Sequence, residues 1–503
     1  MKQIFTFCSV LLSGLVFSQE GTLDTSFGNS GFSVYNSGAY GRSIEIDASQ
    51  RMVVGTYSTS RTFKFFRFSA SNQLDTTFGT GGSTTVSLGG DDAVLYDMKI
   101  QQDGKIVAVG YWESTNSANR KDFVVVRLNA DGTLDTSFNG TGIVTVAFGS
   151  NEDVAQTLAI QNDGKILVAG HSFTGSFRDI AIARLNTNGS LDTTFGTNGK
   201  VTTDLAGNND EARCIAIDKD GKFAVGSFTY GAASSSIFAD FGVAKYNSDG
   251  SLDTSFSTDG KHVVIINPSF NDSPQAIAFQ NDGKILVGGA AFMNTGARDD
   301  FAIVRLNPNG TLDTSFNSDG IFTTSIGTSD DTPSSMKLLS NGKILLAGIV
   351  WAGSFRDIGL IRVTPAGNLD TTFGTNGKTQ QGYGNLSTIE DMDVLSDGRI
   401  VVCGSAGSTN IFLSRFNGTV PAYLDAKDIA ADHHGVSVYP NPVAEVLYCN
   451  EKMEHFELYS VSGELVKSGR NAKEIDVHDL VKGNYLLRIT VKDRTITKKI
   501  IKN

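Results

Sequence analysis

The chain has 503 residues, of which 40% are hydrophobic, and it contains 55 glycines but only 8 prolines. This composition suits many short strands joined by glycine turns, and it excludes a disordered chain. The formal net charge of −11 excludes a broadly basic protein, so we predict no nucleic-acid partner.

The first 18 residues are typical of a secretory signal peptide. Lys2 precedes an apolar run from Ile4 to Phe17, and the small Ser18 predicts cleavage before Gln19. The run is too short for a membrane span, and no later stretch is long enough, so we predict no transmembrane segment. The three cysteines beyond the signal are an odd number far apart, which argues against a disulfide framework.

One phrase, LDT[ST]F, occurs seven times and divides most of the chain into units of 51 to 61 residues; it starts at Leu23, Leu74, Leu134, Leu191, Leu252, Leu312 and Leu369. Each unit contains short alternating or apolar runs separated by Asn, Asp and Gly, which predicts four strands and their turns. No run has the period of an amphipathic helix. An internal repeat of this length indicates one stacked or closed object rather than several independent domains.

The third run of each unit is continuously apolar, as in "FVVVRL" at Phe123 and "IAIARL" at Ile180, which indicates a sheet buried on both faces. We therefore predict an all-β fold, a seven-bladed β-propeller over residues 19–417, with a parallel β-helix as the alternative. The seventh third run, which ends at Arg415, is not followed by the phrase, whereas an extra copy stands at Gly21 to Gly28. The N-terminal segment is therefore predicted to supply the outer strand of the last blade and so close the ring.

A basic residue precedes the aspartate of the phrase by eight positions in six units. A three-residue hairpin loop would place the two directly opposite each other, and a buried charge requires such a partner. We predict structural ion pairs rather than catalytic aspartates, and expect the following threonine to bond the turn backbone and the phenylalanine to pack between blades. The pairs are Arg67 with Asp75, Arg127 with Asp135, Arg184 with Asp192, Lys245 with Asp253, Arg305 with Asp313, Arg362 with Asp370 and, across the closure, Arg415 with Asp24.

The wording of the repeat, "NDGKILVAG" at 162–170 and "IARLNTNGSLDTTFG" at 182–196, resembles the delta-60 type repeat of bacterial surface and secreted proteins. The resemblance covers Gly21 to Asn417. It implies an extracellular propeller-like module, and the family is not tied to one activity.

Residues 418–435 are predicted to form a linker, and residues 436–503 a small β-sandwich of short alternating strands. This last segment resembles the C-terminal sorting domain of type IX secretion cargo from Bacteroidetes, through "YPNP" at 439–442, "DLVKGNYLLRI" at 479–489 and "KKIIK" at 498–502. The resemblance implies the type IX secretion machinery as a partner, and a secreted or outer-membrane surface location.

Two sets of residues are candidate binding groups at one end of the predicted blades. Acidic residues in the loops that enter the first strands suggest a metal site, with calcium possible and no other cofactor expected: Asp92, Asp153, Asp210, Asp272 and Asp331. Ion pairing with arginines of neighbouring loops is the alternative. Aromatic residues after the second strands suggest a surface on which sugar rings could stack, with packing between blades as the alternative: Tyr57, Trp112, Phe173, Phe228, Phe292 and Trp351.

The sequence contains neither a phosphate-binding Gly-x-x-x-x-Gly-Lys-Ser/Thr loop nor a His-Glu-x-x-His zinc motif. No catalytic residue is predicted. The predicted function is non-catalytic binding of a glycan or a protein at or outside the cell surface. The alternatives are a structural or adhesion protein without a small ligand, and a polysaccharide-cleaving enzyme.

Overall fold

The computed structural model describes residues 19–57, 62–89, 92–113, 121–149, 151–231, 238–293, 298–407, 409–418, 438–439, 443–460, 465–480, 483–491 and 494–502. The predicted signal peptide and nearly all of the predicted linker lie outside these residues. The chain divides into two compact units, Met1–Tyr423 and Leu424–Asn503.

The described part of the first unit contains seven four-stranded antiparallel sheets. Sheet 1 comprises β2 (Tyr40–Ile46), β3 (Met52–Tyr57), β4 (Thr62–Phe68) and β5 (Ser83–Ser87). Sheet 2 comprises β6 (Asp92–Ile100), β7 (Ile106–Glu113), β8 (Lys121–Leu128) and β9 (Ile143–Val146). Sheet 3 comprises β10 (Asp153–Ile160), β11 (Ile166–Phe173), β12 (Arg178–Leu185) and β13 (Lys200–Thr203).

The remaining four sheets repeat this order. Sheet 4 comprises β14 (Asp210–Ile217), β15 (Phe223–Tyr230), β16 (Ala239–Tyr246) and β17 (Lys261–Val264). Sheet 5 comprises β18 (Asp272–Phe279), β19 (Ile285–Met293), β20 (Arg298–Leu306) and β21 (Ile321–Thr324). Sheet 6 comprises β22 (Asp331–Leu338), β23 (Ile344–Ala352), β24 (Phe355–Val363) and β25 (Lys378–Gly382). Sheet 7 comprises β26 (Leu386–Val394), β27 (Ile400–Ala406), β28 (Asn410–Phe416) and, from the other end of the chain, β1 (Phe32–Asn36).

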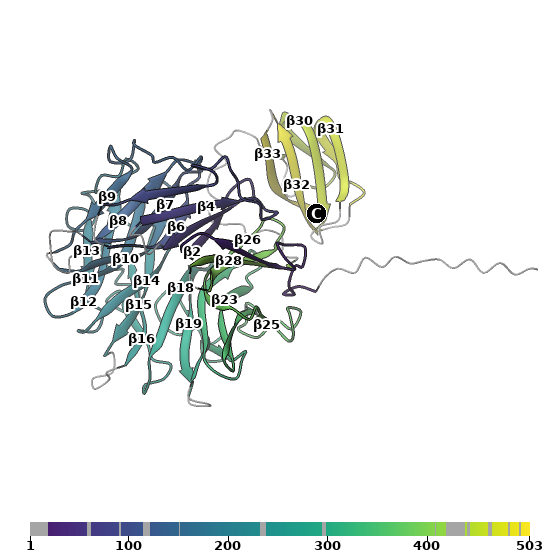
Figure 1. The fold of residues 1–503 in the computed structure, drawn as a ribbon. Helices are drawn as coiled ribbons and strands as arrows, with labels where there is room; N and C mark the ends of the chain where they lie inside the picture. Colours follow the sequence, from purple (N-terminus) through teal and green to yellow (C-terminus); the bar gives the residue numbers. More distant parts are fainter. Residues whose placement is uncertain are drawn as a thin grey trace, which may run out of the picture. The chain divides into compact units, whose positions relative to one another are not determined.

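The sheets pack face to face through their apolar second and third strands. In β12, every residue from Ile180 to Leu185 is buried, and side chains of sheets 3 and 4 meet in one core cluster. The first strands β2, β6, β10, β14, β18 and β26 lie at the centre of the array in Figure 1. Each first strand contacts the next along the chain, and β26 contacts β2.

Every first strand contains a bulge at the same place. In sheet 3, Ala155 pairs with Gly170 and Thr157 with Ala169, so Gln156 has no cross-strand partner. A Cβ on Gly170 would lie 1.9 Å from the carbonyl oxygen of Val154. A glycine therefore makes room for the bulged backbone, and glycines stand in the same position in four further sheets: Gly110, Gly289, Gly348 and Gly404.

The two ends of the first unit meet in sheet 7. β1 pairs with β28 from Phe32↔Ser414 to Asn36↔Asn410. The N-terminal copy of the phrase contributes the isolated bridge Leu23↔Phe416 and backbone hydrogen bonds that join Gly21 and Thr22 to Asn417 and Asp24 to Arg415. The N-terminal segment supplies the outer strand of sheet 7 at Phe32–Asn36, after a turn in which Asp24 accepts hydrogen bonds from Ser26 N and Oγ.

The described strands of the second unit form one five-stranded sheet, rather than the two sheets of the predicted sandwich. It contains β29 (Val438–Tyr439), β30 (Val446–Ser460), β31 (Leu465–Asp476), β32 (Gly483–Val491) and β33 (Arg494–Lys502). The long β30 pairs with β29, β31 and β32, and its register shifts between Tyr448 and Met453. One strand thus carries most of the hydrogen bonding around a core that includes Leu447, Phe456, Leu487 and Ile500.

Candidate functional site

The predicted ion pairs all lie in contact, within 2.6 to 3.3 Å. Asp135 illustrates their environment: its Oδ2 accepts from Arg127 Nε at 2.7 Å and from Lys105 Nζ at 2.9 Å, and its Oδ1 accepts from Ser137 Oγ at 2.6 Å. Burial opposes ionisation, but these donors hold the pKa of Asp135 well below its usual range. Both carboxylate oxygens are occupied, which is a structural arrangement rather than that of a free nucleophile or base.

The same arginine also links neighbouring sheets. Arg127 lies 4.3 Å from the centre of the Phe138 ring and donates through Nη1 to the carbonyl oxygen of Thr187, in the next repeat, at 2.6 Å. The second Ser or Thr after the leucine–aspartate pair, such as Ser137, caps the aspartate. The first, which we expected to bond the turn backbone, is exposed at Thr25, Thr76 and Thr136.

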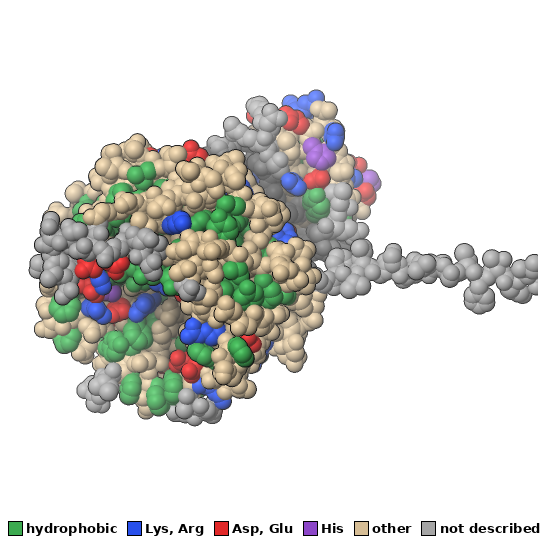
Figure 2. All heavy atoms as spheres, in the orientation of Figure 1, with side chains coloured by type: hydrophobic (Ala, Val, Ile, Leu, Met, Phe, Trp, Pro, Cys, Tyr) green, Lys and Arg blue, Asp and Glu red, His purple; other side chains and the backbone are tan. Residues whose placement is uncertain are grey.

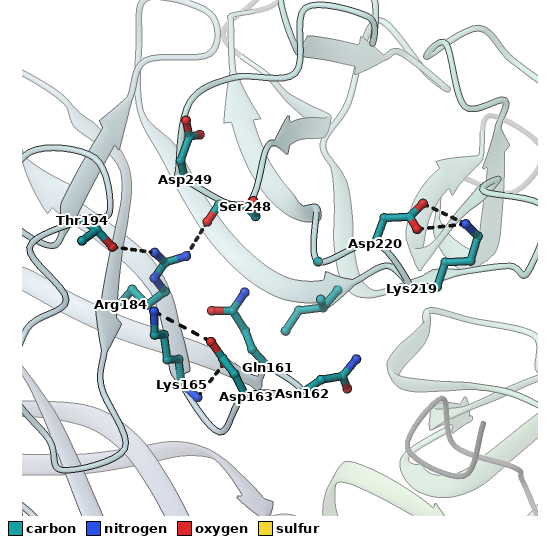
Figure 3. Close-up of a pocket in the computed structure, with 12 residues that line it drawn as sticks. Gln161, Asn162, Asp163, Lys165, Arg184, Thr194, Lys219, Asp220, Ser248 and Asp249 are labelled. Atoms are coloured by element: carbon teal, nitrogen blue, oxygen red, sulfur yellow. Dashed lines mark hydrogen bonds and ion pairs between the residues drawn. The ribbon is translucent and has the colours of Figure 1, made fainter. Parts of the chain in front are cut away.

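A polar pocket lies at the turns between sheets 3 and 4 (Figure 3). Its charged groups are paired: Arg184 bonds the carbonyl oxygen of Ser248 as well as Asp192, and Lys219 lies 2.8 Å from Asp220. Arg184 belongs to the repeated ion pairs, so this pocket is a by-product of the joint between repeats.

The predicted aromatic residues are all half-buried at the ends of second strands. They do not form one ring, because Tyr57 corresponds to Tyr111 rather than to Trp112, and adjacent strand residues face opposite sides. Tyr57 stacks on Tyr40, and Phe292 stacks on Phe270 at 3.9 Å. Phe228 contacts Tyr230, and Trp112 packs against a buried core cluster. Phe173 pairs with Arg178, and Trp351 with Arg356, at the tips of hairpins.

These two hairpins carry exposed aromatic side chains that the sequence analysis missed. Phe177 is 43% exposed and Phe355 is 60% exposed, each within an identical pentapeptide, GSFRD, at 175–179 and 353–357. In the second hairpin the Arg356 guanidinium lies 4.7 Å from the centre of the Trp351 ring. The pentapeptide, which is identical in the hairpins of sheets 3 and 6, was the feature of the sequence that could have pointed to these residues. Acidic, basic and hydrophobic side chains lie next to one another on the face of this unit seen in Figure 2.

Four of the predicted metal-binding aspartates order the loop that precedes them. Asp153, Asp210, Asp272 and Asp331 are wholly buried, and each accepts two backbone N–H groups from residues four to six positions earlier. Burial raises the pKa of Asp210 and of Asp272 to about 6. Asp92 differs, since it accepts the hydroxyl of Tyr111 at 2.7 Å. The five lie in five different sheets, and the structure does not bring them together as one ligand set.

A charged network joins loops of sheets 2, 3 and 4. Glu152 lies 3.5 Å from His171 Nε2, 3.3 Å from Lys121 Nζ and 3.1 Å from Arg178 Nη2. His171 chiefly, followed by Lys121 and Arg178, lowers the pKa of Glu152 to about 2 against the effect of burial. Arg178 also binds Glu211 at 2.7 Å, so the alternative of ion pairing between acidic and arginine-bearing loops describes this region.

The bulge positions of the first strands carry different residue types from one repeat to the next. The unpaired residues are Arg42, Tyr96, Gln156, Arg213, Gln275, Ser334 and Glu390. Arg42 joins two of them: it lies 2.9 Å from Glu390 and 5.0 Å from the centre of the Tyr96 ring. Sequence alternation could not reveal this set, because each bulge adds one residue that interrupts the pattern.

Comparison with protein families identifies both units. A β-propeller family described as a domain of unknown function (DUF5122) matches residues 101–138, 161–195, 219–256, 280–316 and 339–373, and a secretion system C-terminal sorting domain matches residues 437–503. The chain carries DUF5122 β-propeller repeats and a type IX sorting domain. The sorting domain implies a secreted or cell-surface protein that interacts with the secretion machinery. Among the described residues, no helix is long and apolar enough to cross a membrane.

No curated protein matches this chain. Among solved structures, it is similar to a catalytically inactive virginiamycin B lyase from Staphylococcus aureus with quinupristin (12% identity, TM-score 0.41, 77% of this chain and 99% of that chain). It is also similar to a polysaccharide lyase of family PL25, an ulvan lyase (9%, 0.45, 80% and 96%), and to the polysaccharide lyase Uly1 (11%, 0.42, 81% and 94%). At these values the similarity carries no argument about activity.

Proposed function

We propose that the first unit is a closed seven-bladed β-propeller over residues 19–417, followed by the linker 418–435 and the sorting domain 436–503. The support is in sheet 7, where Asp24 lies 2.7 Å from Arg415 Nε. Arg415 in turn donates to the carbonyl oxygen of Ala70, in the first repeat, at 2.6 Å. The bond from Arg415 in the last repeat to the first repeat is thus equivalent to the bond from Arg127 to the repeat that follows it.

The function that the geometry supports best is non-catalytic binding of a glycan or a protein ligand outside the cell. The observation that carries it is the pair of identical GSFRD hairpins with exposed aromatic side chains, Phe355 at 60% and Phe177 at 43%. The exposed ring offers an apolar face for a sugar ring, and the arginine and aspartate that follow it in the sequence are polar groups of the same hairpin. The rigid sheets beneath would hold the two hairpins in fixed positions.

The test is a glycan array probed with the mature chain, residues 19–503. Phe355→Ala and Trp351→Ala are expected to reduce a specific signal at least tenfold. Val34→Ala, which truncates a side chain that is 41% exposed on β1, is the matched control and should leave the signal unchanged. Glycan binding that survives both hairpin variants would overturn the assignment of the hairpins as the binding site, and self-association without any glycan signal would favour the adhesion alternative. Cleavage of a bound polysaccharide would favour the enzyme.

A further inference from the structure

Three carboxylates converge where sheets 3 and 4 meet. Asp179 lies at the start of β12, Asp204 directly follows β13, and Asp210 begins β14; β12 contacts both β13 and β14. One carboxylate oxygen from each lies within 4.8 Å of the others. Ca²⁺ binds oxygen ligands at about 2.3–2.6 Å, so ligands of one ion lie up to about 5 Å apart, which is the spacing seen here.

Asp210 provides an independent indication of a ligand. Its side chain is wholly buried, and its Oδ2 accepts from Leu205 N at 2.7 Å and Ala206 N at 3.4 Å. Its Oδ1 is buried and receives no hydrogen bond, because the hydroxyl of the cross-strand residue Thr229, which lowers the pKa of this carboxyl, donates to Ser227 Oγ at 3.2 Å. A buried carboxylate oxygen without a donor is costly unless a cation or a proton satisfies it.

The cationic side chains around this cluster are engaged elsewhere. Arg178 binds Glu152 and Glu211, and Lys261 Nζ donates to the backbone carbonyl oxygen of Asp204 at 3.1 Å. Thr174 donates its hydroxyl to Asp179, and Gly207 N donates to Asp204 Oδ1 at 2.5 Å. Among the described residues, no Lys or Arg forms an ion pair with any of the three carboxylates.

The third carboxylate distinguishes this joint from the equivalent ones. The residue that follows the outer strand is Asp204 here, but Ala147, Ile265 and Ser325 after β9, β17 and β21. Sheets 4 and 5 thus present Asp240 and Asp272 with Ile265 in the third position. We propose that Asp179, Asp204 and Asp210 bind one divalent cation of the calcium class. The remaining ligands of the six to eight that Ca²⁺ takes would be water.

The test is calorimetric titration of the mature chain, residues 19–503, with CaCl₂. We expect a site with a dissociation constant of about 10⁻⁴–10⁻³ M, the range of extracellular calcium modules. Asp204→Asn changes an exposed residue and is expected to weaken this site at least tenfold. Asp220→Asn, at an exposed and unrelated turn, should not. Asp476, His478 and Asp479 in the second unit could also bind calcium and contribute heat to the titration. Asp476→Ala removes one carboxylate of this group and so tests for that contribution.

A gain-of-site variant tests the same geometry in the opposite direction. Ile265→Asp places a third carboxylate beside Asp240 and Asp272, and is expected to add one site to the titration. The proposal would be overturned if the wild-type chain bound no calcium at a concentration of about 10⁻² M, tenfold above the upper expected dissociation constant. It would also be overturned if Asp204→Asn left the dissociation constant unchanged. Circular dichroism of each variant establishes that the sheets remain folded.

Discussion

Replacement of Asp24 by alanine removes the carboxylate that joins the two ends of the first unit. Asp24 is 8% exposed, and the Arg415 side chain is 5% exposed. The substitution leaves a buried guanidinium without its counter-charge, a change that costs about 3–5 kcal/mol. Arg415 keeps its bond to Ala70 and its contact with the Phe27 ring, which places the expected loss near the lower value, about 3 kcal/mol.

The corresponding change in melting temperature follows from the unfolding entropy. At about 2.1 cal/mol/K per residue, a unit of roughly 400 residues loses about 1 °C per 0.8 kcal/mol, so Asp24→Ala should lower the Tm by about 4 °C. Differential scanning calorimetry should show one transition that moves as a whole. Asp135→Ala is the matched control, because Asp135 makes the same contacts inside the chain.

The reasoning would be refuted by a Tm within about 1 °C of wild type, or by a small early transition with the main one unmoved. Deletion of residues 19–36 adds the loss of β1 and should lower the Tm further than Asp24→Ala. If that deletion leaves the melt unchanged while Asp135→Ala lowers it, the N-terminal segment closes nothing.

Two further outcomes concern pH and packing. Burial raises the pKa of Asp272 to about 6 and that of Asp240 to about 7, so each contributes stability below the unfolded value of 3.8 that is lost as pH rises to about 7. The ion-paired aspartates, whose pKa values are lowered, contribute stability above that value that is lost as pH falls. The Tm measured from pH 3 to 9 should therefore be highest near pH 4–6. Asp240→Asn should make the decline of the Tm toward pH 8 less steep. A wild-type Tm that rises steadily to pH 8 would contradict the predicted maximum. Gly170→Ala forces a Cβ against the Val154 carbonyl oxygen and should lower the free energy of unfolding by about 3 kcal/mol or more. Gly149→Ala places a Cβ with no atom within 4 Å and should be nearly neutral. Equal Tm values for the two variants would disprove the argument that the glycine makes room for the bulge.

The repeat and its ion pairs could be predicted because they depend on local spacing. Arg184 and Asp192 are eight residues apart around a three-residue loop, and the bridge Leu185↔Leu191 has the register that this loop dictates. The bounds of the outer strand of sheet 7 were not predicted, because the turn at Asp24 separates the repeated phrase from β1.

The candidate binding residues were less predictable because a one-residue offset reverses the face of a strand. Tyr57 and Trp112 occupy successive positions of the repeat and therefore point to opposite sides. Asp204 was missed because it follows a strand and Asp210 begins the next one, so only the packing of sheet 3 on sheet 4 brings their oxygens together. Phe177 and Phe355 share the pentapeptide GSFRD, which marks the two hairpins as alike, but the repetition does not by itself show that their rings are exposed.

The joint between the chain ends also determines how the first unit would carry mechanical load. Gly21 N bonds the carbonyl oxygen of Asn417 at 2.7 Å, so the chain enters and leaves this unit at one point. The strand before Asn417, β28, is hydrogen-bonded to β27 on one side and to β1 on the other. A force that separates Gly21 from Asn417 would therefore be borne first by this bond, by the bridge between Leu23 and Phe416 and by the pairing of β1 with β28.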